Sequence, residues 1–140
     1  MLQSLTVLTP ILASMILGAM LFFSAVIAPV TFTKIPIEHA GALIRAIFPW
    51  YYVVLGSVAA LTVLVAPTLT QKALLGLVAA GLLGARFIAI PVINAARDAA
   101  QGGDAQAQAR FDTWHQATVV LNGLEIVALI AVLVLYFRAQ

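Results

Sequence analysis

The sequence predicts an all-α fold, an integral membrane bundle of four transmembrane helices. Of its 140 residues, 64% are hydrophobic and 9% are charged, and the mean hydropathy is +1.11. A soluble domain is usually about 45–50% apolar and about 25% charged, so this chain has too little polar surface to cover a globule in water. The composition therefore excludes an ordinary soluble domain, a disordered protein and a nucleic-acid-binding protein.

Four apolar stretches form a single domain, residues 1–140, and each has at least the roughly 20 residues that cross a bilayer. None shows the two-residue alternation of a barrel strand, and only helices or closed barrels satisfy the backbone in lipid. The first stretch is too long for a secretory signal and has no preceding positive charge, so we expect it to be retained. We predict spans at residues 5–30, 46–66, 73–93 and 117–137, the second continuing a helix that begins near residue 37.

Prolines and polar residues mark the three predicted connections. Pro29 and Pro36 flank the first connection. The second follows Pro67, and Thr70 is its candidate N-cap because a threonine hydroxyl can accept a hydrogen bond from the first helical turn. The third, residues 95–112, is rich in alanine, glutamine and glycine, and we expect a polar loop there.

The positive residues predict an orientation, because lysine and arginine are enriched in cytoplasmic loops. Four of them lie on the side of the first and third connections, and two lie on the opposite side. We therefore expect those two connections in the cytoplasm and both termini outside. The first group is Lys34, Arg45, Arg97 and Arg110, and the second is Lys72 and Arg138. Aromatic residues near the span ends are interpreted as interface belts: Phe48, Trp50, Tyr51, Tyr52, Trp114 and Tyr136.

Two ionisable residues lie deep within predicted spans, Arg86 in the third and Glu125 in the fourth. Each costs at least about 2.5–3.5 kcal/mol to insert, and such residues are functional-site candidates by default. Counted from the shared membrane side at about 1.5 Å per residue, both lie about 15 Å deep. Because the two helices are sequential and antiparallel, we predict an Arg86–Glu125 ion pair.

The polar residues of the third and fourth spans fall into two facing stripes. On the fourth span, the stripe residues recur every three or four positions, which places them on one face of the helix. The third span has a similar stripe. Pro91 removes a backbone hydrogen bond to residue 87 and is expected to kink the third helix. The fourth-span stripe is Phe111, His115, Thr118, Asn122 and Glu125, and the third-span stripe is Arg86, Asn94 and Arg97. Six of these residues are the predicted ligand-binding set: Arg86, Asn94, His115, Thr118, Asn122 and Glu125.

The two histidines, His39 and His115, lie on the same predicted side of the membrane. Paired imidazoles can ligate haem iron or a transition metal, so haem is a candidate cofactor. The alternative is that both are interfacial residues that hydrogen-bond to water or headgroups. The chain has no cysteine, which excludes disulfides, cysteine-ligated zinc and iron–sulfur clusters.

Several segments together resemble the transmembrane protein 205-like family, which is carried in bacteria as a domain of unknown function. The resemblance runs from about residue 18 to the C-terminus and implies a four-helix integral membrane protein, with a transport or trafficking role suggested for its animal member. It also implies a distant similarity to copper-resistance membrane proteins and to a haem-carrying oxidase. Localisation in the bacterial inner membrane follows from it. The matching positions are Phe32, Pro36, His39, Phe48, Pro49, Arg86, His115 and Asn122, and the wider segments include Ala28–Phe32 and Ala85–Phe87 with Pro91.

Three functions remain open from the sequence. The favoured one is binding or transport of a small ligand or ion through the polar stripe between the third and fourth helices. The second is a haem- or metal-binding redox protein that uses His39 and His115. The third is a structural accessory subunit of a larger membrane complex. No G-x-S-x-G, H-E-x-x-H or P-loop motif is present, which favours a non-enzymatic role. The bilayer is the expected partner, with a homo-oligomer or larger complex as further candidates.

Overall fold

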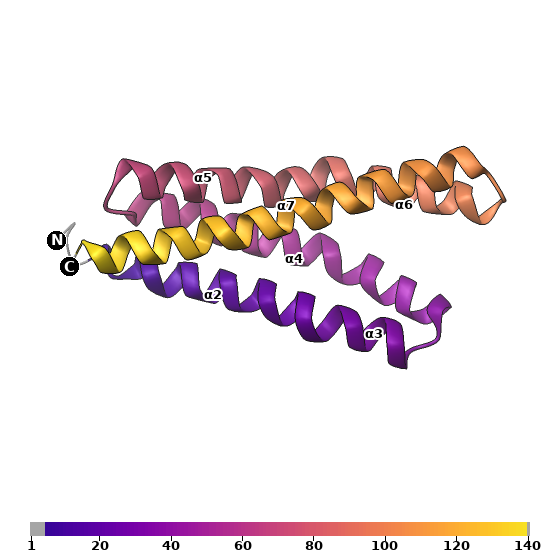
Figure 1. The fold of residues 1–140 in the computed structure, drawn as a ribbon, viewed down its shortest axis with the longest axis horizontal. Helices are drawn as coiled ribbons and strands as arrows, with labels where there is room; N and C mark the ends of the chain where they lie inside the picture. The colour runs from indigo at the N-terminus through magenta and orange to yellow at the C-terminus, as the bar shows by residue number, and fades with distance from the viewer. Residues whose placement is uncertain (1–4, 140) are drawn as a thin grey trace.

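The computed structural model describes residues 5–139, which form four long helical rods (Figure 1). Each rod is long and apolar enough to cross a membrane, and the described residues contain no strand. The predicted all-α bundle of four membrane-spanning helices is confirmed. In chain order the rods are α2 (Leu8–Phe22) with η1 (Phe23–Ile27) and α3 (Ala28–Lys34); α4 (Ile37–Val65); α5 (Leu69–Gly84) with η2 (Ala85–Ala89) and α6 (Ile90–Gln101); and α7 (Ala105–Arg138).

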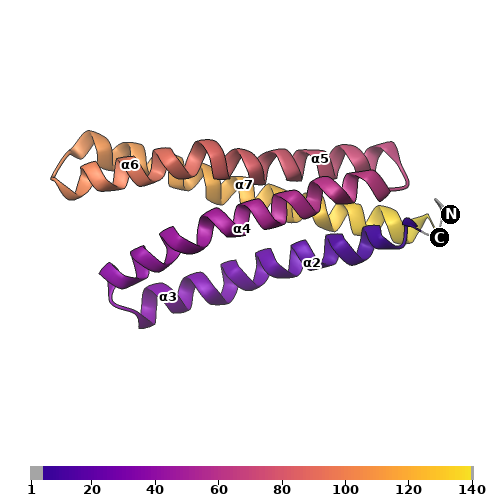
Figure 2. The ribbon, with the colours of Figure 1, turned by 180° about the vertical axis from the view of Figure 1, so that it is seen from behind.

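Consecutive rods run antiparallel, so the three connections alternate between the two ends of the bundle. The start of α2, the end of α7 and the turn between α4 and α5 lie at one end, which we call the terminal end (Figure 1). The other two connections lie at the opposite end, the loop end. There, α3 and α4 diverge from α6 and α7, as the reverse view also shows (Figure 2). The bundle is therefore closed at the terminal end and forked at the loop end.

The closed half contains most of the tightly packed core. Large side chains from three rods are fully buried there, including Ile16, Met20, Leu75 and Leu129, and α4 contributes the fully buried Ala59 and Thr62. Three polar residues are buried with them and donate to backbone carbonyls: Thr9 Oγ1 to Val65 O at 3.2 Å, Thr62 Oγ1 to Val58 O at 2.7 Å, and Gln71 Nε2 to Val132 O at 3.3 Å. Buried polar groups cost free energy unless they are hydrogen-bonded, so these bonds make the closed half a stable anchor.

The rods are longer than the predicted spans, and the third connection differs most from expectation. α6 continues to Gln101 and α7 begins at Ala105, so the predicted loop at residues 95–112 is almost entirely helical. Asp104 caps α7 by accepting hydrogen bonds from the amides of Gln106 at 2.9 Å and Ala107 at 3.1 Å. Alanine and glutamine are good helix formers, so this composition extends the helices beyond the apolar core, and only Gly102–Asp104 turns the chain.

The second connection corrects the predicted cap. Thr68 is the N-cap of α5, and its hydroxyl accepts a hydrogen bond from the Gln71 amide at 3.3 Å. Thr70, the expected cap, lies inside the first turn of the helix. The helix begins at Leu69, one residue before that threonine, so Thr68 is the hydroxyl that reaches the free amides of the first turn.

Two wide π-helical turns, η1 and η2, interrupt the first and third rods. Pro29 lies six positions after the first residue of η1, and Pro91 lies six positions after the first residue of η2. Proline has no amide hydrogen, and its ring crowds the carbonyl four residues before it. A π turn has backbone hydrogen bonds between residues five apart, so it is wider than an α turn and leaves more space beside the proline ring. The expected distortion at Pro91 therefore takes the form of a widened turn, after which the rod continues as α6.

Candidate ligand-binding site

A cavity of about 570 Å³ lies in the fork between α3–α4 and α6–α7. All four rods contribute to its wall, whereas the sequence predicted a site between the third and fourth helices alone. The wall is mainly apolar and aromatic, with a small number of polar groups. Its residues are Phe23, Ser24, Ala28, Pro29, Phe32, Ile44, Arg45, Phe48, Tyr52, Ile90, Ile93, Asn94, Arg97, Phe111, His115, Thr118, Val119, Asn122, Gly123 and Ile126.

Four of the six predicted ligand-binding residues line this cavity: Asn94, His115, Thr118 and Asn122. The His115 ring stacks on Phe111 with centroids 5.6 Å apart and an interplanar angle of 3°. The Thr118 hydroxyl donates to the His115 carbonyl at 2.7 Å, one of the local bonds that a threonine can make within a helix. The predicted stripe on α7 therefore faces the cavity along most of its length.

An aromatic cluster forms the deeper wall of the cavity. The Phe23 ring lies 5.2 Å from that of Phe48 and 4.8 Å from that of Tyr51, and Phe48 stacks on Tyr52 at 5.5 Å. Tyr52 is only 2% exposed, and it lines the cavity together with Asn122. The predicted interface belt is therefore wrong for Tyr52, and also for Tyr136, which is buried at 8% exposure. Trp50, on the same helix, is 73% exposed and does face outward.

A helical spacing pattern in the sequence of α4 could have predicted this wall. Gly41, Arg45, Phe48 and Tyr52 follow one another at spacings of four, three and four residues, which places them on one face of α4. Three of the four line the cavity, and Gly41 lines an adjoining pocket. From the sequence, Arg45 contributes only to the predicted membrane orientation.

The other two predicted ligand-binding residues do not line the cavity. Glu125 is 4% exposed, and its Oε1 occupies the space that a Cβ on Gly81 would need. Arg86 is half-buried, and its guanidinium carbon lies 5.2 Å from the centre of the exposed Phe87 ring. Arg86 Nε and both Glu125 carboxylate oxygens are buried and make no hydrogen bond within the described part of the chain.

The predicted Arg86–Glu125 ion pair is wrong, and the short α6–α7 turn gives the reason. Residues equally far from the turn face each other: Gly81 lies 20 positions before Gln101, and Glu125 lies 20 positions after Ala105. Arg86 is five residues nearer the turn, which is about 7.5 Å of helix. The prediction assumed a long loop at 95–112 and therefore misjudged the relative depth. The salt bridge found among residues 5–139 joins Arg45 and Asp98 instead.

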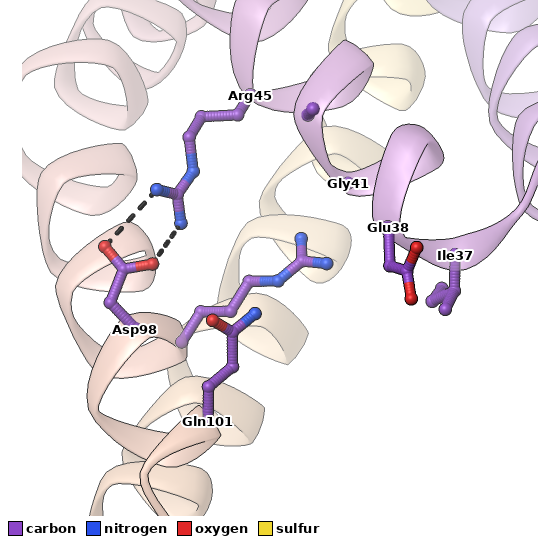
Figure 3. A pocket seen from close by; sticks show the side chains of 8 residues that line it. Ile37, Glu38, Gly41, Arg45, Asp98 and Gln101 are labelled. Atoms are coloured by element: carbon purple, nitrogen blue, oxygen red, sulfur yellow. Dashed lines mark hydrogen bonds and ion pairs between the residues drawn. The ribbon is translucent and has the colours of Figure 1, made fainter.

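Arg45 and Asp98 connect α4 to α6 across the mouth of the cavity. Arg45 Nη2 donates to Asp98 Oδ1 at 2.7 Å, and Nη1 donates to Oδ2 at 3.3 Å, a two-point contact (Figure 3). Beside this pair, the Arg97 guanidinium packs directly over Gly41, in the space that a Cβ would occupy. Both arginines line the cavity and also an outer pocket of about 360 Å³.

The outer pocket continues from the arginines toward the loop end. Its wall includes Ile37, Glu38, Gly41 and Ala42 on α4, and Arg97, Asp98 and Gln101 on α6. Glu38 and Gln101 give it carboxylate and amide groups beyond the two guanidinium groups (Figure 3). The apolar cavity, the arginines and the polar outer pocket therefore follow one another along the fork.

The two histidines lie in different surroundings. His115 lines the cavity, whereas His39 is exposed on the first turn of α4 and lines neither the cavity nor the outer pocket. Within residues 5–139, no group of three or more His, Asp and Glu side chains is placed to hold a metal ion.

Comparison with known proteins gives a family for this chain. No curated protein matches it, and no solved structure matches it. A family described as a domain of unknown function, DUF4149, matches residues 11–102. This match covers about two thirds of the chain, from the first rod to the end of α6, and includes both prolines that follow the π turns. The chain therefore belongs to the DUF4149 family.

Proposed function

We propose that this protein binds a small amphipathic ligand in the cavity between the two arms of the fork. The observation that carries the proposal is the cavity itself, about 570 Å³ in volume with an apolar wall and a few converging polar groups. Ligand sites in proteins have this size and this composition, and they occur between the helices of bundles.

The shape of the cavity favours an elongated ligand. Its wall on α7 extends from Phe111 to Ile126, which are 15 residues apart and therefore about 22 Å apart along the helix. A volume of about 570 Å³ spread over that length leaves room for one extended hydrocarbon chain rather than a fused ring system. The apolar residues Ile90 and Ile126 lie toward the deep end, and Arg97 lies toward the loop end.

The cavity is also accessible from the side. Phe32 and Val119 line it and remain exposed, as does His115. In a bilayer, these residues border the lipid, so a ligand dissolved in the membrane can enter between α3 and α7 without crossing water. This lateral opening supports a ligand taken from the membrane phase.

A photolabelling experiment tests the proposal. The protein is reconstituted in vesicles with lauryl alcohol that carries a diazirine near the end of its chain. After illumination, we expect saturable labelling of cavity residues such as Ile126, because the chain occupies a defined site. Labelling of Val127, which is 63% exposed and lines neither the cavity nor the outer pocket, should rise in proportion to probe concentration. Labelling that does not saturate anywhere would contradict the proposal.

A pair of glycine substitutions provides the matched control. Gly123 lines the cavity, and a Cβ there would meet nothing within 4 Å, so Gly123→Phe should fill the cavity without disturbing the backbone. Gly76 has equally open surroundings but does not line the cavity. We expect Gly123→Phe to abolish saturable labelling of Ile126 and Gly76→Phe to leave it unchanged.

We also propose that the chain is related to the transmembrane protein 205-like proteins and resides in the bacterial inner membrane with both termini outside. Among the positions that carry the resemblance, Phe32, Phe48, His115 and Asn122 line the cavity. The relationship is supported by this grouping, because these residues come from three different rods. The orientation is supported by the excess of lysine and arginine at the loop end.

A further inference from the structure

We infer that the ligand is a membrane phospholipid, bound with one acyl chain in the cavity, its phosphodiester at Arg45 and Arg97, and its headgroup in the outer pocket. This inference rests on the proposed function and specifies the ligand class. It depends on the order of three environments along the fork: an apolar cavity of about 570 Å³, two arginines, and a polar pocket of about 360 Å³.

The arginines point to an anion. Arginine presents a planar set of donors that matches phosphate and carboxylate oxygens. Arg45 is already engaged at two points by Asp98, whereas Arg97 makes no ion pair or hydrogen bond with any side chain in the described structure. The group of Arg45, Asp98 and Arg97 therefore retains one uncompensated positive charge, which a monoanion such as a phosphodiester neutralises.

The outer pocket distinguishes a phosphodiester from a carboxylate. A fatty acid ends at its carboxylate, so it would leave the pocket beyond the arginines without an occupant. A phosphodiester joins two parts of a molecule, and its headgroup continues past the anion. Glu38, Asp98 and Gln101 line that pocket, and their oxygen acceptors suit an ammonium or hydroxyl headgroup.

The depth of the arginines agrees with a lipid headgroup. Arg97 is four residues from the end of α6 and Arg45 eight residues from the start of α4, which are about 6 and 12 Å of helix. α7 has 34 residues and is about 50 Å long, whereas the hydrocarbon core of a bilayer is about 30 Å thick. Both arginines thus lie near the boundary where lipid phosphates are found, and the cavity extends from them into the apolar layer.

Gly41 fixes the position of Arg97. The guanidinium group lies where a Cβ on Gly41 would be, so any larger residue must displace it. The displaced atoms are the far end of a flexible side chain, and the helix backbone need not move. Gly41→Ala is therefore a variant that shifts the anion-binding group without removing its charge.

The test compares three photoactivatable probes with the same diazirine-bearing lauryl chain in vesicles of uncharged lipid. One ends in glycerophosphoethanolamine, one in a carboxylate and one in a hydroxyl. We expect the phosphodiester probe to half-saturate cavity labelling at about tenfold lower mole fraction than the alcohol, the effect of one charged hydrogen bond. The carboxylate probe should fall between them.

Variants assign that preference to the arginines. Within each variant, Arg97→Gln and Gly41→Ala should abolish the preference for the phosphodiester probe over the alcohol. Saturable labelling by the alcohol in the same variant shows that the cavity is still formed. Arg110→Gln is the matched control, because Arg110 is exposed at the same end and lines neither pocket. It should retain the wild-type preference.

The outcomes separate this inference from the proposed function. Saturable labelling by all three probes with equal affinity overturns the phospholipid assignment and leaves the proposed function standing. A carboxylate probe that binds as tightly as the phosphodiester also overturns it. If water-soluble glycerophosphoethanolamine displaces the phosphodiester probe at equal concentration, the site recognises a soluble phosphodiester and the lipid assignment fails. Absence of saturable labelling by any probe refutes both proposals.

Discussion

At the scale of single residues, two glycines determine where two charged side chains lie. Gly41 leaves space for the Arg97 guanidinium, and Gly81 leaves space for the Glu125 carboxylate. Close approach of this kind is a recognised reason for glycine inside a helix, where it is otherwise unfavourable by roughly 0.5–1 kcal/mol relative to alanine. The positions of Arg97 and Glu125 thus depend on the space that these two glycines leave by having no Cβ.

Gly81→Ala should destabilise the protein. The new Cβ would collide with Glu125 Oε1 and approach Leu121 Cδ1, 3.3 Å away. Glu125 is only 4% exposed, so its carboxylate has less room to move aside than the half-buried Arg97 has beside Gly41. We therefore expect a loss of about 1–3 kcal/mol in the free energy of unfolding, as for other overpacked core positions. The measurement is reversible unfolding in mixed micelles. Gly76→Ala, where nothing lies within 4 Å, is the control and should be neutral or slightly stabilising.

A double-mutant cycle assigns the effect to the carboxylate. In the background of Glu125→Ala, Gly81→Ala should cost much less than in the wild type, because the colliding oxygen is absent. A coupling energy of about 1 kcal/mol or more is expected for residues in direct contact. Strict additivity of the two substitutions would show that Gly81 is constrained by something other than Glu125.

At the scale of elements, the two π turns align the helical segments on either side of them. A π turn contains one residue more than an α turn, and one residue corresponds to about 100° of rotation around the helix axis. η2 therefore sets the angle between the core-facing side of α5 and the cavity-facing side of α6. Asn94 and Arg97 face the fork because this extra residue precedes them.

Deletion of Ile88 should be tolerated. Ile88 is exposed and lies within η2, so its loss converts the π turn into an α turn while both flanking segments keep their facing sides. Leu77 is similarly exposed but lies in the regular helix α5, which contains no extra residue. Its deletion should therefore rotate the following part of the rod by about 100° relative to the part before it.

Thermal unfolding in detergent measures this difference. We expect the Ile88 deletion to keep a cooperative transition close to that of the wild type and the Leu77 deletion to lose it. Equal loss of stability in both variants would mean that the wide turn at residues 85–89 does not act as a register insertion.

At the scale of the whole molecule, the bundle is stable at one end and open at the other. The terminal end contains the buried core and the hydrogen-bonded Thr9 and Gln71, whereas the fork contains the cavity. In the fork, the Arg45–Asp98 contact joins the two arms between exposed side chains. Exposed ion pairs contribute little to stability, so the terminal end supplies the rigidity that keeps the cavity open.

Membrane orientation is testable with single cysteines, because the chain has none of its own. Lys72→Cys lies near the terminal end and Gln106→Cys near the loop end. We expect a membrane-impermeant maleimide to label only Lys72→Cys in intact bacterial cells, since the loop end carries more lysine and arginine. Both should react after the cells are lysed. Labelling of Gln106→Cys alone would reverse the orientation, and labelling of both in intact cells would contradict the four-span arrangement.

The sequence by itself determined the fold class and part of the site. Apolar stretches of spanning length can satisfy their backbone in lipid only as helices or closed barrels, so four helices followed from composition and pattern. The stripe of His115, Thr118 and Asn122 followed from helical periodicity, because spacing within one helix fixes which residues share a face. All three line the cavity.

Only the tertiary structure decided which residues of different helices meet. The tight turn at Gly102–Asp104 set the depth of α6 against α7 and paired Glu125 with Gly81 rather than Arg86. The divergence of the two arms brought Arg45 and Arg97 together at the cavity mouth and buried Tyr52 within the aromatic cluster. Periodicity reports angles within one helix, whereas relative depth and divergence depend on turn length and on packing between helices. Those quantities become definite only when all four rods are in place.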